Sequence, residues 1–312
     1  VKEGSEKLVS ENAPGTLTLN SIRDTFENII SVDSLTSDFN QTITMANAAV
    51  QVTDEVDLAK INELRADTTG NITVDEIKDN KANLSTVDAF VAEQGVIGDV
   101  ILSNTEITVT GVVNKEEADI INGYNDVSRT VTLTSVSDVL ANVNTLSSTA
   151  GISIATSDLK VTDVTTLSDA TDLDSYTTGE VTLDIVTDSF LNVQSIHGLT
   201  PAEDGADGVD LTAALITITD PVSLVQANTA NGFSGGLITL NSVIDSFDNL
   251  IEIDAIPSDQ LTMANAVVQV TDEVDLAKIN ELRADTTGNI TVDEVKDTKD
   301  NLATIKTFVL ED

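Results

Sequence analysis

The segment Val50–Glu76 returns letter for letter at Val268–Glu294, 218 residues further along the chain. The similarity continues into the flanks, where Leu261–Asp272 closely resembles Ile43–Asp54. Repetition on this scale is typical of proteins that stack similar structural elements, and a single-site enzyme has little use for it. The repeat therefore constrains the fold more than any other feature, and no set of residues specifies a chemistry as clearly.

A shorter period lies inside the long one. A short apolar-alternating segment that ends in Thr recurs with spacings of 57, 52, 57 and 52 residues, at Thr53, Thr110, Thr162, Thr219 and Thr271. Four such steps make up the 218-residue offset. We divide the chain into a partial module at 1–47 and full modules at 48–99, 100–151, 152–208, 209–260 and 261–312, the last nearly identical to 43–94.

Each module opens with a predicted strand and a short helix. Alternating apolar residues before Thr, as in VQVTD, indicate a strand. The Asp that usually follows is a favourable N-cap, so we expect helices to begin directly after Asp54, Asp163, Asp220 and Asp272, with Pro221 in the first helical position. The segment EVDLAKINEL that follows Asp54 places Leu58, Ile61 and Leu64 on one face of a helix of about ten residues.

The second half of each module opens with a turn such as TTG and another strand. Gly70, Gly179, Gly236 and Gly288 stand at this turn, where we expect a positive φ at the end of the preceding helix. Arg129 occupies the same place in 100–151, so that turn should have a different shape.

The most regular signal in the chain is [VI]-x-D-x-x-x-N, which follows each of these second strands. It predicts structural repeat positions at Asp24 and Asn28, Asp79 and Asn83, Asp138 and Asn142, Asp188 and Asn192, Asp245 and Asn249, and Asp297 and Asn301. We expect the Asp to complement a helix dipole and the Asn to bond the backbone of the next layer. The predicted helix buries Val243, Phe247, Leu250 and Ile251, and likewise Ile22, Phe26, Ile29 and Ile30.

Residues ahead of this second helix have the chemistry of caps. The expected N-caps are Asn20, Asp75, Thr134, Asp184, Asn241 and Asp293. The pairs Ser21–Asp24, Ser135–Asp138 and Ser242–Asp245 have the spacing of a capping box.

Strands that alternate with helices predict an α/β fold with parallel pairing. One module is too small and too poor in aromatic residues to close a core alone. We therefore expect an elongated repeat solenoid of stacked β-α-β-α modules of 52 or 57 residues. A string of small globular βαβ domains is the alternative.

Charge and composition exclude several partners. The chain has 53 acidic and 15 basic residues, a net charge of −38, which argues against nucleic acid and against anionic membrane surfaces. No apolar run is long enough to span a membrane, so direct membrane insertion is not expected. The absence of cysteine excludes disulfides and thiolate metal sites. A salty or calcium-rich exterior suits this charge best.

Calcium is the one cofactor that the residues suggest. In the loop Glu203–Asp210, the side chains Asp204, Asp207 and Asp210 alternate with glycines and offer hard oxygen donors. The spacing is not that of an EF-hand, and the alternative is an acidic surface loop inserted between modules. Neither a nucleophile nor an acid–base set is evident, because His197 is the single histidine and we expect it at a helix C-terminus. We therefore expect no enzyme.

The segments VQVTDEVDLAKINEL, LKVTDVTTLSDATDL and ITITDPVSLVQANTA resemble repeat segments of very large bacterial exoproteins. These are surface-layer, adhesin-like or matrix-forming proteins of cyanobacteria and marine bacteria. The resemblance implies an extracellular structural protein that self-associates into a filament, surface layer or matrix, with calcium as an option. The alternative is an adhesin that binds a glycan or a cell-surface protein through the variable region 95–235.

Overall fold

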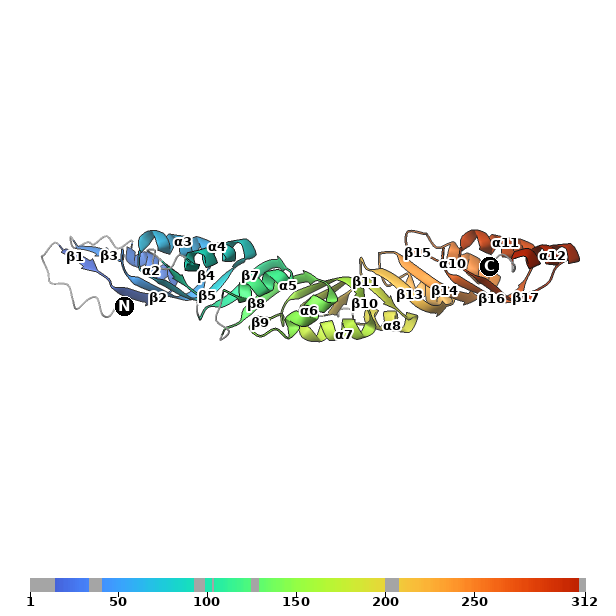
Figure 1. The fold of residues 1–312 in the computed structure, drawn as a ribbon, viewed down its shortest axis with the longest axis horizontal. Helices are drawn as coiled ribbons and strands as arrows, with labels where there is room; N and C mark the ends of the chain where they lie inside the picture. The colour runs from blue at the N-terminus through green and yellow to red at the C-terminus, as the bar shows by residue number, and fades with distance from the viewer. Residues whose placement is uncertain are drawn as a thin grey trace. The chain divides into compact units, whose positions relative to one another are not determined.

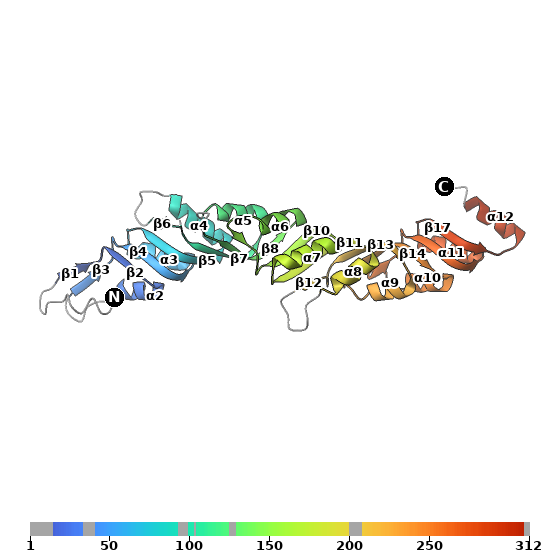
Figure 2. The same cartoon turned by 90° about the horizontal axis from the view of Figure 1, so that it is seen from below.

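The computed structural model describes residues 15–33, 41–92, 99–102, 104–124, 129–199 and 208–308. The chain divides into two compact units, the first made of Val1–Val136 and Thr145–Ile154, the second of Ser137–Asn144 and Ala155–Asp312. In each unit the helices lie along one face of an all-parallel sheet (Figures 1 and 2). We call a main strand together with the helix that follows it a β-α repeat.

In the first unit the sheet order follows the chain, with each main strand beside the next: β2–β4–β5–β7–β8. The elements are β1 (Gly15–Thr18), β2 (Ser21–Asp24), α2 (Phe26–Asp33), β3 (Gln41–Thr44), β4 (Ala49–Val56), α3 (Leu58–Asp67), β5 (Ile72–Asn80), α4 (Lys81–Ala92), β6 (Val100–Ile101), β7 (Glu106–Val113), α5 (Lys115–Asn122), β8 (Val131–Asp138), α6 (Leu140–Ser147) and β9 (Ile152–Ser153). The division between the units falls within β8 and α6.

The second unit repeats this scheme, with the sheet order β10–β11–β13–β14–β16–β17. Its elements are β10 (Asp158–Thr165), α7 (Leu167–Tyr176), β11 (Glu180–Asp188), α8 (Phe190–His197), β12 (Gly208–Asp210), β13 (Leu215–Val222), α9 (Leu224–Ala230), β14 (Ile238–Asp245), α10 (Phe247–Asp254), β15 (Leu261–Thr262), β16 (Val267–Val274), α11 (Leu276–Asp285), β17 (Ile290–Val295) and α12 (Lys299–Phe308). The predicted α/β class and parallel pairing are confirmed.

Two kinds of main strand alternate along the chain. VTD-type strands carry the x-V-T-D pattern or its variant and are β4, β7, β10, β13 and β16. DN-type strands end within two residues of the Asp of the Asp/Asn signal and are β2, β5, β8, β11, β14 and β17. In β4, Val50, Val52 and Val56 are buried against the helices, while Gln51 and Thr53 lie on the opposite face. Short connector strands, which the sequence did not reveal, add to the first half of several DN-type strands, as β6 does on β5.

The VTD-type strands run past their aspartates, so the predicted helix starts there are wrong. In β4 the register with β5 shifts between Val52 and Glu55, and the strand continues to Val56. The N-cap of α3 is Asp57, whose side chain accepts from the Lys60 amide. Pro221 lies inside β13 next to the same shift, a place in a ladder where a missing N–H is tolerated.

The second helix of each module also begins later than predicted. Val243 and Ile22 belong to strands, and α10 buries Phe247, Leu250 and Ile253 rather than Ile251. The residues expected as caps lie in or before the strands, and the three expected capping boxes lie within strands. The reason is that the alternation of buried and exposed residues in each strand continues up to the Asp of the Asp/Asn signal. Capping boxes instead occur at Asn114–Glu117, Thr166–Asp169 and Ser223–Gln226.

The turn glycines are required by close approach rather than by a positive φ. A Cβ on Gly70, Gly179, Gly236 or Gly288 would lie 2.1–2.4 Å from the carbonyl oxygen of Ala48, Ser157, Ala214 or Ala266. The hydroxyl two residues earlier bridges the same contact: Thr286 Oγ1 donates to the Ala266 carbonyl at 2.8 Å and accepts from the Gly288 amide at 2.9 Å. Arg129 instead pairs with Glu106 at 3.2 Å.

Candidate functional site

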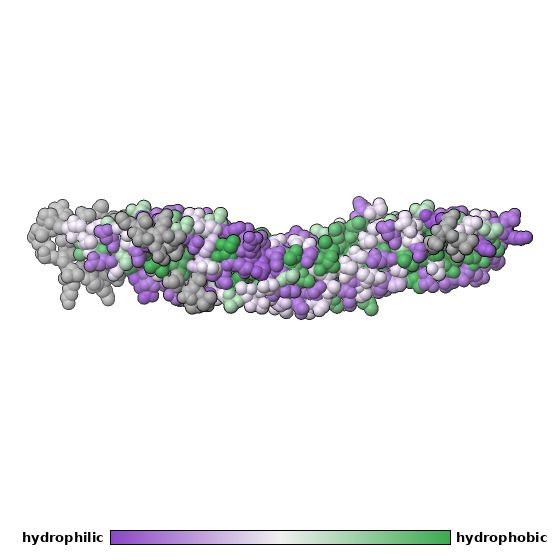
Figure 3. All heavy atoms as spheres, in the orientation of Figure 1, coloured by the Kyte–Doolittle hydropathy of each residue, from purple (hydrophilic) through white to green (hydrophobic). Residues whose placement is uncertain are grey.

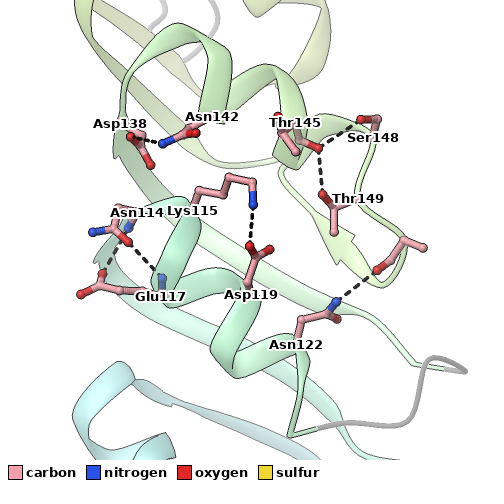
Figure 4. Close-up of polar contacts among 11 residues, drawn as sticks. Asn114, Lys115, Glu117, Asp119, Asn122, Asp138, Asn142, Thr145, Ser148 and Thr149 are labelled. Carbon is pink, nitrogen blue, oxygen red and sulfur yellow. Dashed lines mark hydrogen bonds and ion pairs between the residues drawn. The ribbon is translucent and has the colours of Figure 1, made fainter.

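The repeated Asp and Asn pair is a hydrogen bond within one β-α repeat. The Asn Nδ2 donates to the Asp Oδ1 four residues earlier at 2.7–2.8 Å, in Asp24–Asn28, Asp79–Asn83, Asp138–Asn142, Asp188–Asn192, Asp245–Asn249 and Asp297–Asn301. Figure 4 shows Asp138 and Asn142 in this arrangement. The Asn side chain holds its own aspartate rather than the backbone of the next layer, so that part of the expectation is wrong.

The second oxygen of the DN-type aspartate reaches the preceding β-α repeat. Oδ2 of Asp79, Asp188, Asp245 and Asp297 accepts from the first backbone amide of the helix that precedes its strand, at Leu58, Leu167, Leu224 and Leu276, with distances of 2.8–2.9 Å. These amides are among the groups that have no partner inside the helix. Each aspartate therefore caps a helix that begins 21 residues earlier in the chain.

The VTD-type aspartates do the same for the other set of helices. Asp54, Asp163, Asp220 and Asp272 accept through Oδ1 from the amides of Phe26, Leu140, Phe190 and Phe247, at 2.6–2.8 Å. The sequence pattern predicts these residues as caps of the helices that follow them, and this prediction is wrong. In β7, Gly111 stands at the aspartate position, and the helix that it would cap begins with Lys81 instead of an apolar residue. This joint change in the sequence could have indicated that the aspartate and the start of the preceding helix are partners.

Hydrogen bonding lowers the pKa of several of these carboxyl groups. Burial, the largest single influence, raises the pKa of Asp188, but hydrogen bonds from Leu167, Asn192 and Ser189 outweigh it and leave the pKa below its ordinary value. The pKa of Asp245 is lowered through the same balance, with donors Leu224, Asn249 and Ser246. In Asp297 the amide of Leu276 is the main cause of a lowered pKa. These oxygens are engaged with amides, which accounts for part of the acidic composition.

The proposed calcium ligands are only partly described. Asp204 and Asp207 lie outside the described residues, while Asp210 lies in β12 and accepts from the Thr212 amide at 2.8 Å. Burial, followed by the charges of Asp210 and Asp158, raises the pKa of Glu180. In the part of the chain that the structure describes, no three His, Cys, Asp or Glu side chains gather as a metal site would require.

A hollow of about 420 Å³ lies in the first unit, on the sheet face opposite the helices. Its lining includes Arg23, Gln51, Asp75, Glu106 and Arg129, with both signs of charge. Gln51 Nε2 donates to Asp75 Oδ1 at 3.0 Å, and Arg129 pairs with Glu106.

Other polar contacts stabilise single helices and the turns between repeats. In the first unit, Figure 4 shows the Asn114–Glu117 capping box, the Lys115–Asp119 pair and the bond from Asn122 to the Ala150 carbonyl. His197 ends α8, and its ring lies 5.0 Å from the ring of Phe233. An imidazole packed against an aromatic ring at a helix end gives no support to acid–base catalysis.

Apolar side chains are exposed at several places on the surface. The face drawn in Figure 3 mixes hydrophilic and hydrophobic residues over each unit, and Val112, Leu191 and Val225 are among the exposed apolar side chains. None of the described helices combines the length and apolar character needed to cross a bilayer.

The fold defines a class: an α/β protein with all-parallel sheets of repeated β-α units, joined by aspartates that cap the helices of neighbouring repeats. Comparisons of the chain with protein families, with curated proteins and with solved structures gave no match.

Proposed function

We propose that the chain is a structural segment of an extracellular fibre, surface layer or matrix, folded as an elongated α/β solenoid. The observation that carries this proposal is the capping of eight helices by an aspartate of the next repeat, with distances of 2.6–2.9 Å. Such junctions join neighbours in series, and this is the contact that a protein built for length uses.

The long sequence repeat supports the same proposal. Lys60 and Lys278, equivalent residues of the two copies, lie 5.3 and 4.9 Å from the ring centres of Phe26 and Phe247. Arg65 and Arg283 lie 3.5 and 4.0 Å from those of Phe90 and Phe308. Helices α3 and α11 thus make the same cation–ring contacts, and a fibre or lattice needs the same lateral contact at regular intervals.

Electron microscopy of the purified protein tests this proposal. We expect regular filaments or sheets that form through self-association, with calcium screening or bridging the negative charge. Compact single particles at every protein, salt and calcium concentration would contradict both the solenoid and the structural role. Thermal melts with calcium and with a chelator test the ion separately, and an unchanged midpoint removes calcium from the proposal.

A second candidate is an adhesin, and the hollow that contains Arg23 and Arg129 favours it. Its lining lies mainly on β2, β4, β5 and β7, so the ligand would bind largely before the variable region 95–235. The replacement Arg23→Ala should weaken binding to a glycan array, and Lys160→Ala, at an exposed lysine of the second unit, is the control. If the protein binds no glycan on the array, the adhesin candidate is ruled out and only the structural role remains.

A further inference from the structure

The last two described elements, β17 and α12, resemble an interior repeat in sequence, but their apolar side chains are exposed as at the edge of a sheet. The residues of β17 repeat those of β5 at an offset of 218, with Val295 in place of Ile77. In β5, Ile72, Val74 and Ile77 are buried; in β17, Ile290, Val292 and Val295 are only half-buried. The helices differ more: Leu84 of α4 is 1% exposed, and Leu302 at the same place in α12 is 42% exposed.

The first unit shows what buries these residues in the interior copy. Strand β5 pairs with β6 through Ile72 and Thr73 and with β7 from Glu76 to Asn80. Helix α4 contacts β6, β7 and α5. Among the described residues, β17 pairs with β16 alone, so its other edge keeps the unpaired N–H and C=O groups of a sheet edge.

The helix start indicates which kind of repeat fits this face. Helices that follow DN-type strands and begin with Phe or Leu receive an aspartate from the next strand, as Phe247 does from Asp272. Helix α4 begins with Lys81, the next strand has Gly111 at the aspartate position, and Lys81 Nζ pairs instead with Glu117 of α5. The Asn80 side chain then caps α4 within its own repeat by accepting from the Asn83 amide at 3.1 Å.

Helix α12 matches α4 at its start, because it begins with Lys299 where α4 begins with Lys81. Thr298 Oγ1 accepts from the Asn301 amide at 3.3 Å, but α8 has the same local cap at Ser189 besides the cap from Asp220, so the lysine is the residue that distinguishes the two kinds of helix. A DN-type strand such as β2 of a second copy does not fit, because every main strand that pairs with a DN-type strand in either unit is of the VTD type.

We propose that the face formed by β17 and α12 is a docking surface for one further β-α repeat of the β7–α5 kind. The docked strand carries glycine at the position of Gly111, and its helix carries an acidic residue that pairs with Lys299 as Glu117 pairs with Lys81. This inference rests on the fold and not on the proposed extracellular role. A chain that forms no filaments could still have this surface.

The chain itself supplies the test, because Phe308 is equivalent to Phe90 and the sequence contains no cysteine. Residues 91–124 are attached after Phe308, and the Leu302→Cys thiol reports burial through its rate of maleimide labelling. We expect labelling to slow at least about tenfold, toward the rate of Leu84→Cys in the unextended chain, because a covered thiol reacts only after local opening. An extension of equal length with Ile107→Asp and Val109→Asp should leave labelling fast.

Two further chains test the kind of repeat. An extension of residues 200–231, whose strand carries Asp220, should protect the thiol less. In the chain that carries the 91–124 extension, Lys299→Glu should speed labelling of the thiol. Adding Glu117→Lys in the attached copy of residues 91–124 should slow labelling again. Fast labelling with both extensions, or equal protection by both, overturns the proposal. Slow labelling of the unextended chain that depends on protein concentration also overturns it, because a second copy is then the occupant.

Discussion

The backbone amide of Leu224 donates to Oδ2 of Asp245 at 2.9 Å, although the two residues belong to successive β-α repeats. Oδ1 of the same carboxylate accepts from the Ser246 amide at 2.8 Å and from Asn249 Nδ2 at 2.7 Å. One side chain thus caps the start of α9, fixes the turn into α10 and holds an Asn on that helix. The Asp and Asn of the repeated signal therefore form a junction between two successive repeats.

Replacing Asp245 by Ala should lower the free energy of unfolding by about 1–3 kcal/mol, because three donors lose their acceptor. Asp245→Asn should cost less, since its amide oxygen keeps one acceptor. The control is Glu252→Gln, which removes one negative charge from an exposed position of α10. Denaturant melts measure the difference, and equal midpoints for Asp245→Ala and the control would contradict the role of the junction.

Replacing Gly236 by Ala should destabilise the second unit by about 1–3 kcal/mol, as overpacking does. The new methyl group would lie 2.3 Å from the Ala214 carbonyl oxygen, a backbone atom that cannot move away alone. Gly232→Ala is the matched control, because its methyl group would lie 3.4 Å from its nearest neighbour. A thermal melt that ranks the two variants equally would show that the close approach is relieved by small shifts.

Replacing Thr286 by Val should cost about 1–3 kcal/mol of stability, because the Ala266 carbonyl and the Gly288 amide both lose a buried partner. Thr286→Ser keeps the hydroxyl and should retain most of the stability. If Ser and Val are equally destabilising, then the methyl group of Thr286 and not its hydroxyl is what the turn requires.

Stability should depend on pH in two steps of opposite sign. Burial and neighbouring carboxylates raise the pKa of Glu180 and Asp285, so their protonation stabilises the fold as the pH falls from neutral through the raised values. The lowered pKa values of Asp188, Asp245 and Asp297 act oppositely, because that stability is present above the ordinary carboxyl value and is lost below it. Chemical melts from pH 7 to pH 2 should give maximal stability at mildly acidic pH.

The variant Glu180→Gln should raise the melting temperature at neutral pH and low salt. Its carboxylate lies near those of Asp158 and Asp210, and the repulsion is worth a few tenths of a kcal/mol at an exposed position. The gain should shrink in high salt, because screening already removes the repulsion in the parent. A gain that is independent of salt would assign the effect to the burial of the Glu180 carboxylate and not to its repulsion by Asp158 and Asp210.

The sequence alone determined the alternation of main strands and helices, the repeat spacing and the parallel pairing. Alternating Val and Ile residues in segments such as Val50–Val56 specify a strand with one buried face, and the short helices between strands leave only parallel neighbours. These properties depend on local periodicity and chain length. They can therefore be predicted from one sequence.

Only the tertiary structure decided what the aspartates do. Asp54 and Asp245 have the chemistry of a local N-cap, and sequence reasoning placed helix starts beside them. The structure instead pairs each with a helix of the preceding repeat, because the strand bulge and the stacking of repeats set where each carboxylate ends. The same holds for Leu84 and Leu302, which share one place in the repeat and differ in exposure because a further repeat covers only the first.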